Sequence, residues 1–238
     1  MSESKVCVVV GVGPGLGASS ARRFAKEGFD VGLVARRREV LEPVARDVEK
    51  LGGRAFVAPS DASDPEAVER AYGDISRALG APSVLVYNSG AFHMGGVLEL
   101  SVDAFESAWK TLCFGGFLWA RAAAPAMLAR SSGTMIFTGA TASLRGGARF
   151  SGLAVGKFGL RALAQSLARE LHPKGVHVAH VIIDGQIDSE RVRQMAPGRS
   201  PSELLSPDAI AESYWHLHAQ PRTTWTHELD LRPNAEKF

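Results

Sequence analysis

The chain has 238 residues, of which 45% are hydrophobic and 22% charged, proportions that are ordinary for one globular domain. A formal net charge of +2, with no long lysine or arginine tract, argues against nucleic acid or an anionic membrane surface as a partner. The residues up to Lys5 have the pattern of neither a signal peptide nor a membrane span. Cys7 and Cys113 lack metal-ligand spacing, so we expect a cytoplasmic protein with two buried free thiols.

Apolar runs of strand length alternate with helical patterns along the whole chain. The expected strands are Lys5–Val10, Asp30–Ala35, Arg54–Ala58, Ser83–Tyr87, Gly133–Thr138, Val176–Ile183 and Thr226–Leu231. The first six are nearly continuous apolar runs, which is typical of parallel strands covered on both faces. The helices expected between them are Leu16–Glu27, Arg38–Leu51, Pro65–Leu79, Ser101–Ala129, Ser151–Leu171 and a helix near Asp208–His218.

Repeated strand–helix units predict one α/β domain over residues 1–238, a Rossmann-like, doubly wound parallel sheet of about seven strands with helices on both faces. The two long helices, Ser101–Ala129 and Ser151–Leu171, are apolar around much of their circumference. We expect them to be buried, in part against another subunit. The proline- and serine-rich stretch from Pro197 to Pro207 predicts a mobile substrate lid around residues 188–220.

A glycine-rich turn, Gly11-Val12-Gly13-Pro14-Gly15-Leu16-Gly17, joins the first expected strand to the first expected helix. Glycine permits unusual backbone angles and lets main-chain amides approach a pyrophosphate at the helix N-terminus. This context predicts a dinucleotide-binding loop, and an unliganded glycine turn is the simpler alternative. The predicted cofactor-binding residues of the loop are Gly11, Gly13, Gly15, Leu16 and Gly17.

The spacing of these glycines resembles that of the short-chain dehydrogenase/reductase family, with Val10 in the place of the family's threonine. Three later segments, in the right order, are also similar to the family's: Asp61-Ala62, Tyr87-Asn88-Ser89-Gly90 and Gly185-Gln186-Ile187-Asp188-Ser189. The resemblance covers nearly the whole chain, although Tyr87 replaces an asparagine and Asp184 a proline. It implies a homodimer or homotetramer formed through the two long helices. It also implies a cofactor site that includes Asp61, Ala62, Asn88, Gly90, Gly185, Ile187 and Ser189.

The end of the second expected strand bears on the choice of cofactor. It reads Ala35-Arg36-Arg37-Arg38, with no carboxylate before Glu39. An acidic residue here would bind the ribose 2′-hydroxyl of NAD and repel a 2′-phosphate. Arginines at a helix N-terminus oppose the helix dipole, and a bound phosphate removes that conflict. The sequence therefore predicts NADP in preference to NAD, bound by Arg36 and Arg37, against the alternative of a solvated basic cap.

The catalytic positions that the resemblance implies are largely apolar. They are an asparagine in the long central helix, a serine after the fifth strand, and a tyrosine and a lysine four residues apart on one helix face. Lys157 is present, which the resemblance implies binds the cofactor ribose, but Leu153, Ala140 and Leu112 stand in the other three places. No tyrosine lies between Tyr87 and Tyr214, so a shift of the alignment does not supply the missing residue. Loss of a positioned general acid costs about 10²–10⁴ in rate, so the family's ordinary chemistry is expected to be severely impaired.

Other side chains are candidates for the missing proton donor. Thr141 and Ser143 lie beside the serine place, and His93 follows the fourth strand where the family's substrate pocket begins. The simpler alternatives are a surface histidine at position 93, a lysine at 157 that binds only the ribose, and a packing role for Leu153. The histidines show no metal-ligand pattern, so no metal site is expected.

Two functions are compatible with these features. The first is an NADP-dependent oxidoreductase that transfers hydride between the cofactor and a fairly apolar carbonyl or alcohol substrate through a non-standard active site. The second is a catalytically inactive NADP(H)-binding scaffold or redox sensor. Both require cofactor binding, and the sequence does not choose between them or name the substrate.

Overall fold

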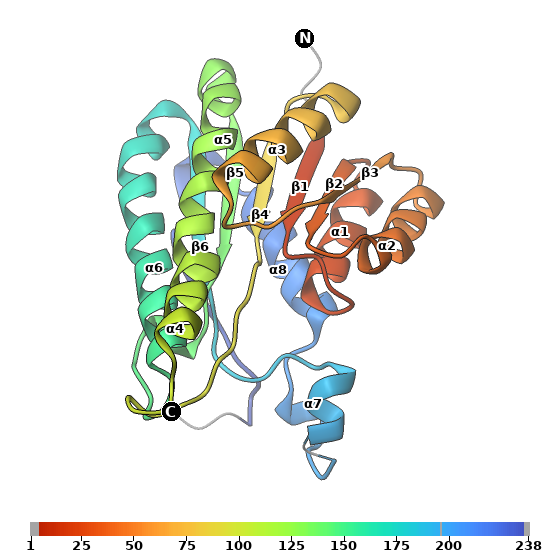
Figure 1. Ribbon diagram of the computed structural model, residues 1–238. Helices are drawn as coiled ribbons and strands as arrows, with labels where there is room; N and C mark the ends of the chain where they lie inside the picture. The colour runs from red at the N-terminus through yellow and green to blue at the C-terminus, as the bar shows by residue number, and fades with distance from the viewer. Residues whose placement is uncertain (1–4, 196, 236–238) are drawn as a thin grey trace.

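The computed structural model describes residues 5–195 and 197–235. Seven parallel strands form one sheet in the order β3-β2-β1-β4-β5-β6-β7, with helices on both faces (Figure 1). This architecture confirms the predicted doubly wound fold, and every strand boundary lies within two residues of its predicted place. The strands are β1 (Val6–Val10), β2 (Asp30–Ala35), β3 (Ala55–Pro59), β4 (Val84–Tyr87), β5 (Gly133–Thr138), β6 (Val176–Ile183) and β7 (Glu228–Leu231).

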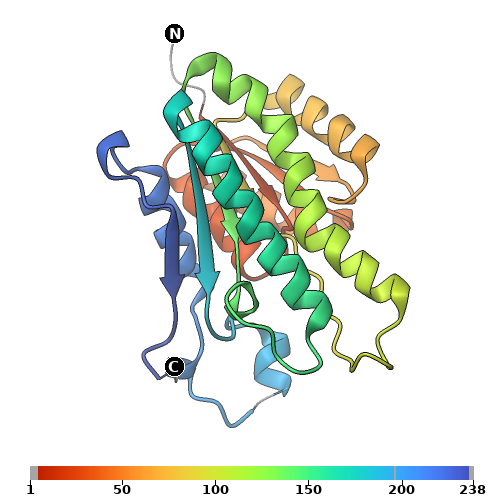
Figure 2. The ribbon, with the colours of Figure 1, turned by 90° about the vertical axis from the view of Figure 1, so that its left-hand side faces the viewer.

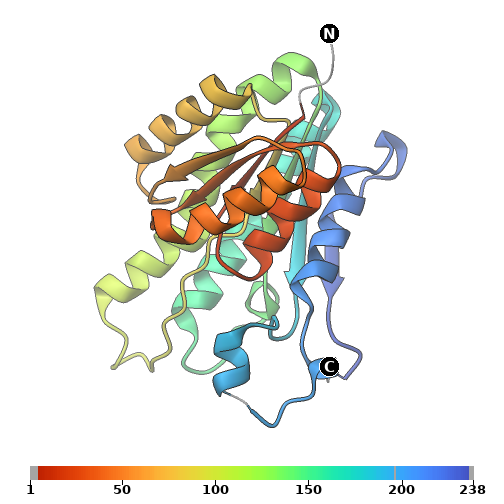
Figure 3. The same cartoon turned by 90° about the vertical axis from the view of Figure 1, so that its right-hand side faces the viewer.

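One layer of helices covers the face of the sheet that is turned to the viewer in Figure 2. Its core combines strand residues such as Tyr87 and Phe137 with Trp119 and Leu160 from the helices, all fully buried. The layer consists of α3 (Pro65–Leu79), α5 (Gly115–Arg130) and α6 (Ser151–Leu171). The opposite face, seen in Figure 3, is covered by α1 (Leu16–Lys26), α2 (Arg38–Lys50) and α8 (Pro207–His218).

Two covered faces explain the nearly continuous apolar strands. Successive side chains of a strand point to opposite faces, so a strand between two helical layers needs an apolar residue at every position. All five residues of β1 and all eight of β6 are buried.

Helix starts follow local chemistry: Asp64 accepts a hydrogen bond from the backbone amide of Ala67 at 3.1 Å and caps α3, which begins with Pro65.

The expected helix Ser101–Ala129 is interrupted by one π-helical turn. α4 (Val102–Trp109) continues through η1 (Lys110–Phe114) into α5. The Tyr87 hydroxyl donates a 2.5 Å hydrogen bond to the carbonyl oxygen of Thr111 inside this turn. The segment Val102–Arg130 is long and apolar enough to cross a membrane by length and composition only, and 44% of its most apolar part is buried inside this fold.

Burial of this segment is uneven. α5 buries Trp119 and Met127, but α4 buries only Ala108 and leaves Phe105 and Trp109 more than a third exposed. Within this chain only α5 therefore has the expected burial, and the burial of α4 against another subunit stays a prediction. Cys113, in the π turn, is likewise only partly buried, whereas Cys7 is fully buried in β1.

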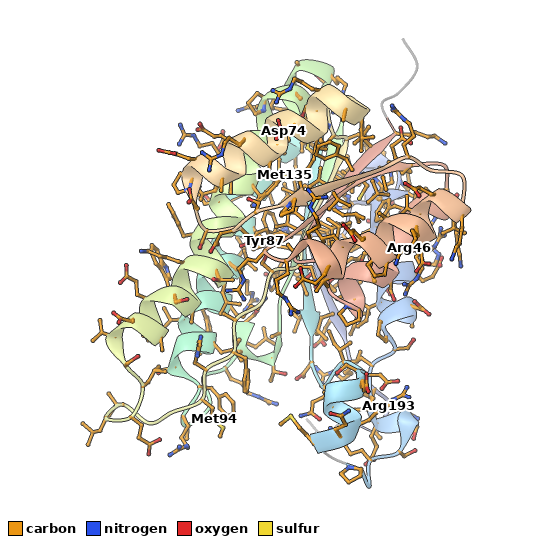
Figure 4. The ribbon with its side chains drawn as sticks, turned by 45° about the vertical axis from the view of Figure 1, so that its right-hand side comes forward. Arg46, Asp74, Tyr87, Met94, Met135 and Arg193 are labelled. Carbon is orange, nitrogen blue, oxygen red and sulfur yellow. The ribbon has the colours of Figure 1, made fainter. Side chains whose placement is uncertain are left out.

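The carboxyl ends of all strands meet at one edge of the sheet, which the arrowheads mark in Figure 2. The β4–α4 loop and α7 (Glu190–Met195) extend beyond this edge, and Met94 and Arg193 mark them in Figure 4. The predicted lid region around 188–220 thus comprises α7, the whole of α8 and the segment between them, with residue 196 outside the described residues. Short helical turns complete the structure: η2 (Thr141–Ser143), η3 (His172–Lys174), η4 (Pro201–Glu203) and η5 (Arg222–Thr224).

Candidate functional site

The glycine-rich turn between β1 and α1 lies at the carboxyl edge of the sheet. Gly11 has φ +88°, and a β-carbon there would lie 2.5 Å from the amide nitrogen of Ser89. A β-carbon at Gly17 would lie 2.7 Å from the carbonyl oxygen of Gly11. These two glycines therefore allow the turn to approach the β4–α4 loop and the helix to approach the turn. Gly13 and Gly15 instead face open space.

The start of α1 is suited to an anion. No side chain caps the helix and its first turn contains no acidic residue. Unpaired backbone amides and the helix dipole make such an end favourable for a phosphate. Asn88 braces the turn from the neighbouring strand, because its side-chain amide donates a 3.0 Å hydrogen bond to the carbonyl oxygen of Gly11.

A cavity of about 530 Å³ follows this edge. Its wall is made by residues 10–13, 34–36, 60–63 and 89–93, with Ser107 and Thr111. A second cavity of about 440 Å³ shares Gly13 and Arg36 with the first and adds Arg37. The sequence-predicted residues that the larger cavity brings together are Gly11, Gly13, Arg36, Asp61, Ala62, Gly90 and His93.

The arginine cluster lies at the open N-terminus of α2. Arg37 is the N-terminal cap residue, but no side chain caps the helix, and Glu39 is the one acidic residue of its first turn. The Arg37–Glu39 pair is 3.7 Å apart and both side chains are exposed, so it contributes little. Arg36 is exposed at the cavity wall, and its charge also acts on Asp61.

Asp61 is organised by its own loop. Ser63 donates two hydrogen bonds to it, from the amide at 2.8 Å and from the hydroxyl at 2.7 Å. Partial burial alone would raise the pKa of Asp61, but these hydrogen bonds and the charge of Arg36 outweigh it, and the net pKa lies below its usual value. This end of the cavity thus combines a fixed carboxylate with a cationic group.

The remaining predicted residues lie outside the lining of this cavity. Lys157 is buried and donates a 2.6 Å hydrogen bond from Nζ to the carbonyl oxygen of Thr138, and burial lowers its pKa to about 8. Gly185 and Ile187 belong to the segment after β6, where Ile187 bridges to Leu205. Ser189 accepts a 3.2 Å hydrogen bond from the amide of Val192 at the start of α7.

Ser143 is fully buried inside η2, away from the cavity. Its hydroxyl accepts a 3.1 Å hydrogen bond from the amide of Ala140 and lies 3.4 Å from Nε2 of His180. His180 and Lys157 form a buried polar cluster, and the charge of the partly exposed Glu228 also acts on His180. Burial first, and then the charge of Lys157, lowers the pKa of His180 to about 4. The structure gives Ser143 a position in this internal cluster.

Thr141 and His93 are the predicted proton donors that keep contact with solvent. His93 is exposed on the β4–α4 loop and lines the larger cavity. Thr141 is partly buried and donates a 2.5 Å hydrogen bond to Oδ1 of Asp184. Tyr214 is fully buried, where its hydroxyl shares a 2.7 Å hydrogen bond with Thr138.

Several features of the site were missed in the sequence. Hydroxyl groups line much of the cavity, at Ser60, Ser63, Ser89, Ser107 and Thr111. Isolated serines and threonines in loops give no sequence signal, because they are common in every turn. The partner of Asp184 was also missed, since Arg232 lies 3.0 Å away in space but after the next strand of the chain. Within the described residues, no three His, Cys, Asp or Glu side chains are grouped to hold a metal.

Comparison with known proteins agrees with this geometry. The family profile described as short chain dehydrogenase matches residues 5–199. The short-chain dehydrogenase/reductase eriH of Hericium erinaceus is 31% identical over 181 residues, covering 74% of this chain and 72% of the relative.

Two solved structures are similar over nearly their whole length. A short-chain dehydrogenase from Rhodopseudomonas palustris has 38% identity and a TM-score of 0.84, covering 97% of this chain and 99% of its own. A metagenomic short-chain oxidoreductase solved in complex with NADP has 30% identity and a TM-score of 0.84, covering 98% of each chain. On its sequence, its sheet order and its glycine loop, this chain belongs to the short-chain dehydrogenase/reductase family.

Proposed function

We propose that this chain is an NADP(H)-dependent oxidoreductase that interconverts an alcohol and a carbonyl compound at the carboxyl edge of its sheet. The observation that carries the proposal is the cavity that runs from the glycine loop to Arg36, with the uncapped start of α1 beside it. The similarity to a short-chain oxidoreductase solved with NADP supports the same cofactor. The nicotinamide of such a cofactor supplies or accepts a hydride when bound.

The residues of the chain fit the parts of this cofactor. Gly13 and Gly15 leave room for a pyrophosphate at the start of α1. Arg36 and Arg37 would hold the 2′-phosphate, for which a guanidinium is a well-matched donor. Asp61 would contact the adenine, and the segment from Gly185 to Ser189 would hold the carboxamide. Lys157 would reach the ribose by exchanging the Thr138 carbonyl for a ribose hydroxyl.

The substrate is proposed to be fairly apolar. Phe92 lines the cavity and is 56% exposed, and Met94 next to it on the loop is 59% exposed. Met195 at the end of α7 is 72% exposed at the same end of the molecule. An apolar substrate would cover these side chains and gain their burial.

Cofactor preference is tested by fluorescence titration with NADPH and NADH. We expect Arg36→Ala to weaken NADPH binding by about 10–100-fold, since a hydrogen bond to a charged group contributes roughly 1.5–3 kcal/mol. NADH binding is expected to change little. Arg38→Ala is the matched control, because Arg38 is exposed but lines neither cavity. A wild-type protein that binds neither dinucleotide overturns the proposal.

Turnover is tested by transfer of labelled hydride from NADPH to a panel of apolar aldehydes and ketones. We expect transfer by the wild type, and its loss in His93→Ala would assign the acid to the histidine. The variant Leu153→Tyr with Ala140→Ser restores the family's usual donors. Transfer by this double variant alone would show that the natural chain is not a reductase.

The second candidate function is an inactive NADP(H)-binding scaffold or redox sensor, within a cytoplasmic homo-oligomer. The observation that favours it is the apolar character of three catalytic places at once, with Leu112 fully buried. Tight NADPH binding with no hydride transfer to any carbonyl, and none from any alcohol, would establish this function in place of the first.

A further inference from the structure

Three residues at the ends of neighbouring strands form a chain of polar contacts. Thr141 follows β5, Asp184 follows β6 and Arg232 follows β7, and these strands lie side by side with their carboxyl ends together (Figure 2). The Thr141 hydroxyl donates a 2.5 Å hydrogen bond to Oδ1 of Asp184. A guanidinium nitrogen of Arg232 lies 3.0 Å from Oδ2. Each carboxylate oxygen therefore has its own partner.

The carboxylate of Asp184 is almost completely enclosed, with its side chain 5% exposed. A buried carboxylate is costly unless it is paired and hydrogen-bonded, so the contacts from Arg232 and Thr141 are what permit it here. The resemblance places a proline at this position, so neither strand order nor register requires an acid. The chain therefore encloses a carboxylate, paired at both oxygens, at a position where the family resemblance expects no acid.

Thr141 and Asp184 each adjoin a segment that the family resemblance assigns to the active site. Asp184 directly precedes Gly185, the start of the segment proposed to hold the nicotinamide. Thr141 directly follows Ala140, which stands in the place of the family's serine. Thr141 is partly exposed, while the Asp184 carboxylate that its hydroxyl contacts is enclosed. The substrate oxygen and Asp184 would therefore meet through Thr141.

The hydrogen-bond direction restricts what Thr141 can bind. A threonine hydroxyl has one proton, and here that proton is directed to Asp184. The oxygen is left as an acceptor, and its partner in a substrate must be a donor. The O–H group of an alcohol is such a donor, whereas a carbonyl oxygen is bound only when Asp184 carries the proton and the Thr141 hydroxyl donates to the substrate, as in the reverse reaction.

We propose that Thr141 and Asp184 form a proton relay in place of the absent phenol, and that this relay takes the hydroxyl proton of an alcohol. The inference rests on the proposed function, because it requires a bound oxidised nicotinamide. The substrate carbon loses its C–H electron pair as hydride to that nicotinamide, and its C–O bond becomes a carbonyl. The substrate hydroxyl proton passes to Thr141 Oγ1, and the Thr141 proton passes to Asp184.

The relay returns to its starting state after the product leaves, when the proton on Asp184 passes back through the Thr141 hydroxyl to solvent. Thr141 ends each cycle as a neutral hydroxyl, so no alkoxide accumulates. Arg232 keeps its charge throughout and is a positioning residue for Asp184. Asp184 acts on the substrate only through Thr141, and is itself a positioning and proton-accepting residue.

The test uses the whole protein with NADP and three probes: isopropanol, cyclohexanol and benzyl alcohol. Thr141→Val removes the relay hydroxyl. Asp184→Asn keeps an acceptor for Thr141 but cannot take up a proton. We expect each to lower kcat by about 10²–10⁴. Thr141→Ser retains a hydroxyl and is expected to stay within about tenfold of the wild type.

Asp230→Asn is the matched control. Asp230 also contacts Arg232, at 2.5 Å, but it has no contact with Thr141 among the described interactions. Its removal is expected to change kcat less than about threefold. Two further measurements separate a relay from a structural effect. The NADPH dissociation constant is expected to be unchanged in all variants, and added formate is expected to restore part of the rate of Asp184→Ala.

Each other result has a definite meaning. Full activity of Thr141→Val or Asp184→Asn overturns the relay, as does equal loss in Asp184→Asn and Asp230→Asn. A wild-type protein that binds NADPH but oxidises none of the three alcohols overturns the relay and leaves the cofactor site standing. A protein that binds no dinucleotide overturns the proposed function itself.

Discussion

Leu112 fills the space that Gly156 leaves on the facing side of α6. A β-carbon at Gly156 would lie 2.6 Å from the β-carbon of Leu112. Leu112 is fully buried, in the place where the family resemblance puts an asparagine. Leu112 is thus part of the packing between α6 and the π turn. The absence of a β-carbon at Gly156 leaves the room that the leucine side chain occupies.

We expect Gly156→Ala to lower the free energy of unfolding by roughly 1–3 kcal/mol, because the added methyl overpacks this contact. Leu112→Ala is expected to cost roughly 2–5 kcal/mol through the cavity it leaves. The double variant should lose somewhat less than the sum, since Leu112→Ala removes the Cδ1 and Cγ contacts at 2.8 and 3.2 Å, although the contact between the two β-carbons remains. Urea unfolding of the four proteins measures the coupling.

Gly73→Ala is the control for this cycle. Gly73 is also helical, but a β-carbon there would meet only the end of Arg77 at 3.5 Å. Alanine has the higher helix propensity, so this variant is expected to gain about 0.5–1 kcal/mol. Strictly additive effects at positions 112 and 156 would contradict the packing relationship.

Acid should destabilise the protein through His180. Burial, with the charges of Lys157 and Arg161 and against the opposing charge of Glu228, holds its pKa at about 4. The pKa of histidine in the unfolded chain is near 6.5, so the unfolded state binds a proton that the native state does not as pH falls from about 6.5 to 4. Stability is therefore lost in this window, by up to roughly 3 kcal/mol.

Unfolding free energies measured across this pH window test the assignment. In His180→Gln the slope with pH is expected to be smaller, whatever the variant's overall stability. His216→Gln serves as the control, since the His216 side chain is 70% exposed, and its slope is expected to match the wild type. An unchanged slope in His180→Gln would show that other groups govern acid unfolding.

Glu228 also makes stability fall with pH, in a lower pH window than His180. Arg161 donates to both of its oxygens, at 2.7 and 2.8 Å, and this holds the pKa of Glu228 at about 2. A lowered carboxyl pKa stabilises the fold above the unfolded value near 4.5, and this stability is lost as pH falls toward 2. Glu228→Gln is expected to cost about 1 kcal/mol at neutral pH and nothing near pH 2.

Chemical denaturation measures the free energy of unfolding of Glu228→Gln, and Glu66→Gln is a suitable comparison in the same measurement. Glu66 pairs with Arg70 at 3.3 Å, but both side chains are largely exposed. Solvent screens such a pair, so its loss is expected to change stability by less than about 0.5 kcal/mol. Equal costs for the two variants would show that the Arg161–Glu228 pair has no special weight.

An apolar face along α4, α5 and α6 predicts self-association. Its aromatic members include Phe105, Trp109, Phe117 and Phe158, each between 37% and 42% exposed. Burial of such a face drives association, so we expect Trp109→Glu to shift the wild-type oligomer toward monomer in analytical ultracentrifugation. Leu98→Glu, on the β4–α4 loop and 97% exposed in the wild type, is expected to leave association unchanged. A wild type that sediments as a monomer at micromolar concentration would contradict this prediction.

The positions of the glycine turn and the arginine cluster were predictable because their signals are local. The glycine turn lies between a strand and a helix that adjoin it in the chain, and the arginines follow directly on β2. Asp64 and Pro65 likewise specify the start of α3 within two residues. Such features depend on backbone geometry and helix ends, which short sequence segments determine.

The sequence by itself determined the layered sheet, the order of its elements and the place of the glycine-rich turn, because periodicity and turn chemistry act over a few residues. Only the tertiary structure decided which titratable side chain each hydroxyl group contacts. Ser143 turned inward to His180, and Thr141 turned to Asp184 and through it to Arg232. These contacts join the ends of strands far apart in the chain, so strand order and register had to be fixed before a partner was defined.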